Sequence, residues 1–512
     1  MVNTPIVKDQ LAFRFTGEYF GGESYINNNP NPLPAGFDPN ITESKRVRAK
    51  LLWEPAAAPG LSLLFSAEHT DIKGPTEGFF NGNIDGLSVN GVFAFASAYE
   101  DVEQSIYSAR ATYEFSENVA VVARLAYLEN DLLFRDTGET LFPGATFGAT
   151  GFNKELTETE VYVRFQDLGI VNTGVFGVIH SEEDEVGFNN GALLSFNLTG
   201  KIENTGIYGE VELDAGALLP GVAVILGGRY EMDERSRTTF DGAGNLVGSG
   251  SFSEDVFLPK LGLRYDLNDR TSFGYVYSEG FRGGGLDVDL GAPFGGFAFS
   301  SVAFGPERLK QHELYAKTTV LGGQFDLAAS AFFYIWEDAH VSGAAVYPAS
   351  GDSALGNIPE AEGRGLELSA TYRATSTLTF DGAIGLLDTE ITKVTAAQAG
   401  FLGLDLPRAP NTTASLGVSY EGPNGFDAYA RARFVGDHFS ALNQAKLDDY
   451  TVVDIGFGYE FEVSTGKTMR VEGFVENLFD ERYLTFTEAT AFGGLNKVGQ
   501  PRTFGISATM KF

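Results

Sequence analysis

The side chains of this chain that could do chemistry are aromatic and charged rather than nucleophilic. The 512 residues include no Cys, which excludes a thiol nucleophile, a disulfide scaffold and a Cys zinc site. No G-x-S-x-G, P-loop or H-E-x-x-H motif occurs, and the Gly-rich FRGGGLD at 281–287 has no strand–loop–helix setting around it. We therefore expect neither an enzyme nor a resident cofactor.

Histidines and one acidic run are the candidate metal ligands. The acidic run covers residues 182–185, and all the histidines fall at strand ends or in loops that we place on the outer side. The histidines are His69, His180, His312, His340 and His438. They could hold a metal or a metal chelate, but chance placement and a solvated loop are the simpler interpretations, so we predict no metal site.

Aromatic and basic side chains at a spacing of two are candidate contacts for a solute. Tyr334 and Trp336 share one face of the segment 326–336, and Tyr429, Arg431 and Arg433 share one face of 428–434. Facing an interior, they could bind a solute. The alternative is that such arginines form ion-pair ladders along the wall, with Glu367 or Asp454 as carboxylate partners.

Loops rich in Phe are a second group of candidates. The aromatic loop residues are Phe79, Phe80, Phe93, Phe95, Phe294, Phe297, Phe299 and Phe304, and we select Phe294 and Phe297 as solute contacts. Exposed apolar patches often mark binding sites. Packing of the loops against themselves and a membrane-interface aromatic girdle are the alternatives.

Apolar residues alternate with polar ones along most of the chain. In 366–373 and 503–512 every second residue is apolar or aromatic, and the segments run near ten residues or more, which is the length of a tilted strand that crosses a bilayer. No apolar run reaches the length of a membrane helix. The net charge of −32 would repel phosphate backbones, so we expect no nucleic-acid partner.

Short turns and long loops alternate along the sequence. The nine short turns lie at 54–60, 115–119, 166–169, 214–221, 266–270, 320–324, 373–377, 420–425 and 462–467. Long polar, Gly-rich stretches separate them. Short periplasmic turns and long outer loops are typical of outer-membrane barrels. The sequence therefore predicts an all-β fold: one transmembrane antiparallel β-barrel of about 20 strands over residues 1–512, in contact with outer-membrane lipid.

Four segments resemble the TonB-dependent outer-membrane receptor family. They are FLPKLGLRYDLNDRTSFGYVYSEGFRGGG (257–285), GPERLKQHELYAKTTVLGGQFDLAASAFFYIWEDA (305–339), NIPEAEGRGLELSATYRATSTLTF (357–380), and the pair NLFDERY (477–483) with GQPRTFGISATMKF (499–512). They occur in the family order. The resemblance implies an outer-membrane receptor barrel for uptake of a solute such as an iron chelate.

The resemblance also implies what is missing. Family members carry a coupling motif, a plug domain and a 22-stranded barrel, whereas residues 1–20 here resemble the second turn and third strand of that barrel. We expect a chain without plug, signal peptide and first two strands, either a fragment or a plugless member. The TonB complex is then a partner only if a plug is encoded upstream of Met1. The alternatives are a passive outer-membrane pore and a structural surface protein whose loops bind a partner.

The two chain ends yield two more expectations. With an even number of strands, the first and last are antiparallel, so we expect 11–20 to lie beside 501–512 and close the barrel. Phe512 ends an alternating strand and resembles the signal that the barrel assembly machinery reads. The alternative is an ordinary lipid-facing aromatic.

Overall fold

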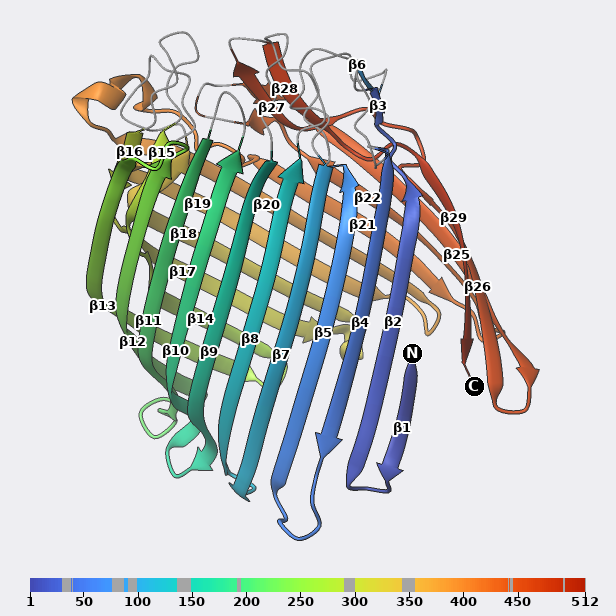
Figure 1. Ribbon diagram of the computed structural model, residues 1–512. Coiled ribbons are helices and arrows are strands. Elements are labelled where there is room, and N and C mark those ends of the chain that lie inside the picture. The colour runs from blue at the N-terminus through green and yellow to red at the C-terminus, as the bar shows by residue number, and fades with distance from the viewer. Residues whose placement is uncertain are drawn as a thin grey trace.

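The computed structural model describes residues 1–29, 38, 40–75, 87–90, 99–135, 149–190, 195–289, 300–342, 355–440, 442, 445–490 and 493–511. In this part of the chain, 21 strands form one sheet in which every strand is antiparallel to its neighbour in sequence order. The sheet curves into a tall barrel-shaped wall, with short turns at the lower end (Figure 1). The all-β membrane-barrel fold predicted from the sequence is confirmed.

The strands of the main sheet are longest in the middle of the chain. They are β1 (Val2–Val7), β2 (Leu11–Glu23), β4 (Ile41–Trp53), β5 (Leu61–Pro75), β7 (Tyr99–Ser116), β8 (Val119–Arg135), β9 (Ala149–Leu168), β10 (Val171–Asn190), β11 (Ser195–Asp214), β12 (Val222–Asp241), β13 (Leu246–Asn268), β14 (Thr271–Arg282), β17 (Glu307–Val320), β18 (Phe325–Ser342), β19 (Leu355–Arg373), β20 (Leu378–Lys393), β21 (Thr412–Glu421), β22 (Phe426–Val435), β25 (Tyr450–Ser464), β26 (Lys467–Glu476) and β29 (Thr503–Lys511).

Smaller elements lie outside the main sheet. Four two-stranded sheets pair β15 (Gly285–Asp289) with β16 (Ser300–Phe304), β23 (His438–Phe439) with β24 (Lys446–Leu447), β27 (Leu484–Thr490) with β28 (Gly493–Val498), and β3 (Asn27–Asn29) with β6 (Ser88–Asn90). The 3₁₀ helices in the described part of the chain are η2 (Leu321–Gly323) and η3 (Ala396–Phe401). No helix among the described residues is long and apolar enough to cross a membrane.

Alternation determines which side chains face lipid and which face the interior. Residues directly opposite each other in an antiparallel pair share one face of the sheet. Leu314 of β17 lies opposite Ala331 of β18, and the Leu314 side chain is 60% exposed on the outer face. The neighbouring residue Tyr315 lies opposite Ser330 on the other face. The outer face is therefore apolar and the inner face largely polar.

All nine predicted short turns are confirmed. The strands on either side of each turn end and begin inside the predicted ranges or within two residues of them, and a tenth turn at 8–10 joins β1 to β2. Several of the turns need glycine; Gly60 and Gly425, for example, have φ of +86° and +85°. A Cβ on Gly60 would also come within 2.7 Å of the Glu114 carbonyl oxygen.

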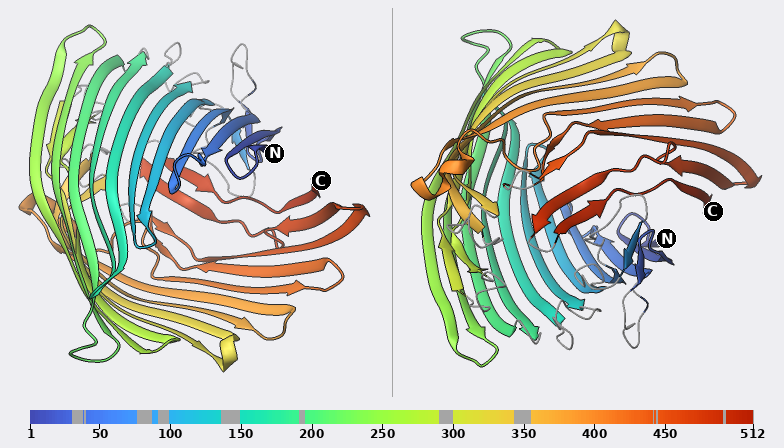
Figure 2. Two further views of the ribbon diagram at one scale, coloured as in Figure 1. Left: turned by 90° about the horizontal axis from the view of Figure 1, so that it is seen from below. Right: turned by 90° about the horizontal axis from the view of Figure 1, so that it is seen from above.

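The predicted seam is wrong. Residues 11–20 belong to β2, whose two edges are taken by β1 and β4, and β29 pairs only with β26 among the described residues. The sequence analysis assigned 1–20 to one turn and one strand, whereas Val2–Val7 form an additional strand. Since the strand number is then odd, β1 and β29 run in the same direction and cannot pair as antiparallel neighbours. Figure 2 shows the two termini on facing, separate edges of the wall.

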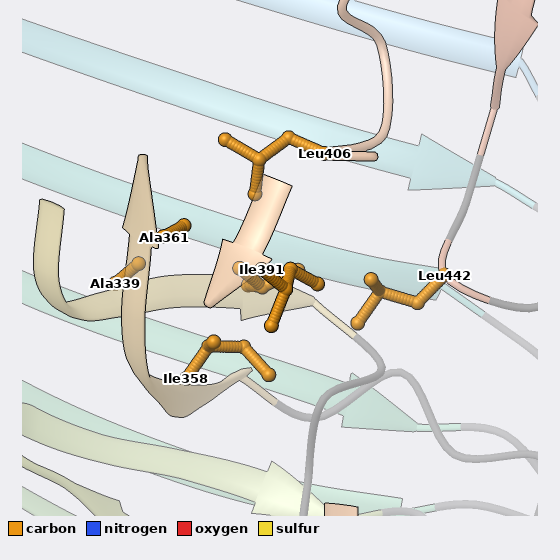
Figure 3. Close-up of a cluster of buried hydrophobic side chains, with 7 residues drawn as sticks. Ala339, Ile358, Ala361, Ile391, Leu406 and Leu442 are labelled. Atoms are coloured by element: carbon orange, nitrogen blue, oxygen red, sulfur yellow. The ribbon is translucent and has the colours of Figure 1, made fainter. Parts of the chain in front are cut away.

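The largest buried apolar cluster lies at the outer end of the barrel rather than in the one-sheet-thick wall. It joins Val341, Ile358, Ile391, Leu406 and Leu442 (Figure 3). Phe401 of η3 packs against this cluster. Loop residues 404–409 and Leu442 therefore fold onto the ends of β18–β20. One alternative for the Phe-rich loops was that the loops pack against themselves. Loops do pack on one another here, but through aliphatic side chains rather than through the phenylalanines selected above.

Candidate functional site on the inner wall

Tyr334 faces the interior, as the alternation predicts. Its Cα partners across β18 are Gln311 of β17 and Gly363 of β19. The phenol ring lies over Gly363, where a Cβ would come within 2.1 Å of the Tyr334 Cζ atom. The ring also stacks on Phe332, with centroids 6.3 Å apart. Because Gly363 has no side chain, the Tyr334 ring can lie over it. Together with Phe332 it forms an aromatic surface that faces the interior.

Trp336 belongs to a buried polar cluster nearer the outer end of β17 and β18. Its Nε1–H donates to Glu307 Oε2 at 3.0 Å, and the backbone N–H of His340 donates to the same oxygen at 2.5 Å. Arg282 pairs with Glu307 Oε1 at 3.3 Å. The Glu307 side chain is only 7% exposed, so these donors are what allow a carboxylate to be buried there. The hydrogen bond to Glu307 orients the indole, which also packs against the apolar cluster at the outer end of the barrel.

The β22 candidates form a separate group. Arg433 donates to Asp454 Oδ2 at 2.9 Å, so the carboxylate ladder considered for Asp454 is present. The Tyr429 ring lies over Gly456, and Arg431 lies opposite Asp454 in register but makes no ion pair within the described structure. Strands β19, β20 and β21 separate this group from Tyr334 and Trp336. The sequence candidates therefore form two patches rather than one site.

The loop candidates Phe294 and Phe297 lie outside the described residues, as do Phe79, Phe80, Phe93, Phe95 and Phe299. Phe304 is described, and its ring meets the imidazole of His340 edge-on at 5.0 Å. Phe304 is the last residue of β16, and its contact with His340 packs the β15–β16 pair against β18.

A charged stripe on β12 was missed by the sequence analysis. The inward residues at every second position are Arg229, Glu231, Asp233, Arg235 and Arg237. Arg229 pairs with Glu231 at 2.5 Å, Arg235 with Asp233 at 2.6 Å, and Arg237 with Glu185 of β10 at 2.6 Å. The sequence pattern could have predicted this stripe, since charged residues of both signs occupy every second position from 229 to 237.

The Gly-rich FRGGG segment makes room for this stripe. A Cβ on Gly283 would come within 2.2 Å of Asp233 Oδ1 and 2.6 Å of Arg235 Nε. The end of β14 therefore packs directly on the Asp233–Arg235 ion pair, and the glycines permit a close approach rather than bind a phosphate.

The lower inner wall carries a polar depression of about 850 Å³. Its lining includes Asp266, Lys317, Asp326 and Thr371, whose side chains lie on the inner face by register. Asp326 accepts hydrogen bonds from Thr319 at 2.7 Å and from Arg373 at 2.6 Å. Polar groups thus continue along the inner wall to the periplasmic end.

The histidines do not gather. His69, His180 and His312 each have Nδ1 within 3.0 Å of a neighbouring hydroxyl oxygen on an adjacent strand, and His340 is buried beside Glu307. No group of three or more potential ligands from His, Cys, Asp or Glu occurs in the part of the chain that the structure describes. The placement at strand ends and loops is wrong for His69, His180 and His312, which lie within strands.

The NLFD segment connects three strands. Asn477 is buried and has φ of +49°. Its backbone N–H donates to Asp454 of β25 at 2.9 Å, and its amide nitrogen donates to the carbonyls of Glu481 and Gln500 at 2.9 and 3.0 Å. The motif that carries the family resemblance is therefore a structural corner.

Comparison with known proteins agrees with this architecture. A family model described as "TonB dependent receptor-like, beta-barrel" matches residues 12–478. The pesticin receptor of Yersinia pestis is 23% identical over 290 residues, which are 56% of this chain and 41% of that receptor. The chain thus matches less than half the length of this relative.

Solved structures share the fold over nearly the whole chain. The ferric yersiniabactin uptake receptor of Yersinia pestis superposes with a TM-score of 0.81 at 18% identity, covering 99% of this chain and 76% of that one. A siderophore receptor of Acinetobacter baumannii superposes with a TM-score of 0.74 at 14% identity, covering 99% and 78%. At these identities the likeness shows the fold alone.

Proposed function

Because this chain belongs to the TonB-dependent receptor-like β-barrel family, we propose that it is the wall of a receptor that takes up a scarce metal chelate, such as a ferric siderophore. Barrels of this family lie in the bacterial outer membrane, and so does this chain; the family consists of transporters rather than enzymes. The observation that carries the proposal is the inward aromatic surface of Tyr334 and Trp336, held beside buried Glu307, which pairs with the exposed Arg282.

The two patches suit a large, partly aromatic and polar solute. Flat rings offer contact area at low conformational cost, while arginines offer hydrogen-bond donors to the oxygens of a chelate. In the patch on β22, the Arg431 guanidinium is available to donate to a solute, because it has no ion-pair partner among the described residues. A solute moving inward from the outer mouth would meet Trp336 and Tyr334 first.

Tryptophan fluorescence can test chelate binding at the inner wall. It contains two tryptophans, of which Trp336 lies on the inner wall, while Trp53 ends β4 near the periplasmic turn and is 44% exposed. Adding ferric catecholate or ferric hydroxamate chelates to the refolded barrel should quench tryptophan fluorescence. The quenching should persist in Trp53→Phe and disappear in Trp336→Phe. The iron-free chelators serve as the control.

We further propose that energised transport, through the TonB complex, belongs to a longer protein that carries a plug. A fragment of such a receptor and a plugless member are distinguished by the coding sequence upstream of Met1. In the longer protein, uptake of the chelate should depend on both the plug and TonB.

The passive pore is the second candidate, and the observation in its favour is the polar inner wall. Glu367, Arg431, Arg433, Asp454 and Glu472 all fall on the inner face by register. With a net charge of −32, a wet lumen should favour cations. Steady cation current in planar bilayers, together with no chelate-induced quenching of Trp336, would favour the pore over the receptor.

A further inference from the structure

The outer face of the wall has a groove in its periplasmic half. The groove has a volume of about 630 Å³ and lies over β13, β14, β17, β18 and β19. Its side-chain lining includes Phe273, Tyr275, Leu314, Ala316, Ala329 and Leu366. All of these residues share the lipid-facing side of the sheet, because each lies opposite an outward residue of the next strand.

Small residues create the groove. In one cross-strand row, Phe273 lies opposite Ala316, and Ala316 lies opposite Ala329. In the next row, Tyr275 lies opposite Leu314, which lies opposite Ala331. The half-buried alanines form a floor, while Phe273, Leu314 and Leu366, which are 44%, 60% and 55% exposed, stand up as walls.

The ends of the groove show how it is oriented in the membrane. Leu219, in the short turn between β11 and β12, lines the lower end, and short turns lie on the periplasmic side. Tyr275 lines the part farther from that turn, and its hydroxyl is hydrogen-bonded to His312 Nδ1 at 2.8 Å. The groove therefore runs upward from the periplasmic boundary.

We propose that this groove binds an acyl chain of a phospholipid from the periplasmic leaflet as a resident lipid. The groove faces hydrocarbon, its floor and walls are apolar, and the Tyr275 hydroxyl already has a partner. An acyl chain that lies on the alanine floor between Phe273, Leu314 and Leu366 recovers the dispersion contacts that an empty gap would lose. Because Leu219 of a periplasmic turn lines the groove, the lipid would come from the periplasmic leaflet.

Retention of lipid by the purified barrel tests the proposal. After extraction into a mild detergent, native mass spectrometry should show phospholipid bound to the parent protein. The double variant Ala316→Leu/Ala329→Leu fills the floor and should reduce the bound fraction several-fold. The matched control Ala430→Leu/Ala432→Leu adds the same atoms to outward positions of β22, outside the groove, and should retain the lipid.

A second measurement locates the lipid. In a Trp53→Phe/Trp336→Phe background, Phe273→Trp places the sole tryptophan in the groove wall. Phospholipid with brominated acyl chains should quench it more strongly than it quenches a tryptophan placed instead at Leu416, and the floor-filling pair should abolish that difference. Equal lipid retention in parent and filled variants would overturn the proposal. A self-associating parent that becomes monomeric on filling, without bound lipid, would also overturn it and identify a contact between two copies.

Discussion

Asn477 joins three strands of the barrel through one buried residue. Replacing it with Leu keeps the approximate volume but leaves the carbonyls of Glu481 and Gln500 without their donor. Buried polar groups that lose their partners cost about 1–3 kcal/mol each, so we expect Asn477→Leu to lower the free energy of unfolding by about 2–6 kcal/mol. Denaturant unfolding in micelles, followed by circular dichroism, measures this. Asn424→Ala, in an exposed turn, is the control, and an equal effect of the two changes would contradict the role of the corner.

Asp480 gives the same corner a pH dependence. The Arg502 backbone N–H donates to Asp480 Oδ1 at 2.9 Å and holds the pKa of that carboxyl below its ordinary value. A depressed pKa stabilises the folded state above the unfolded value of about 3.9, and this contribution is lost as the pH falls through the lower folded value. Hydrogen exchange of the Arg502 amide should therefore be faster in Asp480→Asn than in the parent near neutral pH. In strong acid the two rates should converge. Asp269→Asn, in a turn at the other end of the barrel, should change nothing at Arg502.

The last strand is the element with a predicted signal for assembly. Phe504, Ile506 and Met510 of β29 are 71%, 85% and 50% exposed on the lipid face, as the alternation predicts, whereas Phe512 lies outside the described residues. Deleting Phe512 removes one aromatic contact worth about 1.5–3 kcal/mol, so refolding into detergent should barely change.

The cellular outcome distinguishes a signal from an ordinary girdle residue. Deletion of Phe512 should sharply reduce the yield in the outer membrane if the assembly machinery reads the terminal aromatic. Phe504→Ala, which removes an aromatic from the lipid face of β29, should leave the yield nearly unchanged. Equal yields for the parent and the deletion would defeat the signal hypothesis.

The open seam is a property of the whole molecule. The edges of β1 and β29 carry backbone N–H and C=O groups that must be paired within a bilayer, at a cost of several kcal/mol for each unpaired group. Because the two edges run in the same direction, an added strand antiparallel to both would satisfy them, whereas direct pairing would have to be parallel. The wall in isolation should thus remain open between its two termini.

Engineered disulfides can test the seam, since the chain contains no Cys. Cys at Val471 and Ala508, which are direct partners across β26 and β29, should oxidise readily in the refolded protein. Cys at Ile6 and Ile506, on the two open edges, should remain unlinked under the same conditions. A high yield of the Ile6–Ile506 disulfide would show that the barrel closes directly.

The sequence by itself determined the features that depend on neighbouring residues. Alternation at period two predicted the strands and the inward direction of Tyr334, Trp336, Arg431 and Arg433, because successive side chains of a strand must point to opposite faces. The short turns were equally readable, since a turn of a few residues is specified by its own Gly, Pro, Asn and Asp.

Only the tertiary structure decided the features that depend on partners far apart in the chain. The burial of Glu307, the ion pair of Arg237 with Glu185 and the alanine floor of the groove each require neighbouring strands to be in register. The seam depended on one short strand, Val2–Val7, which changed the strand count from even to odd. Each strand carries its own alternation of apolar and polar residues. Which side chain lies opposite a given residue, and which strand pairs with a given edge, is decided only when the sheet assembles.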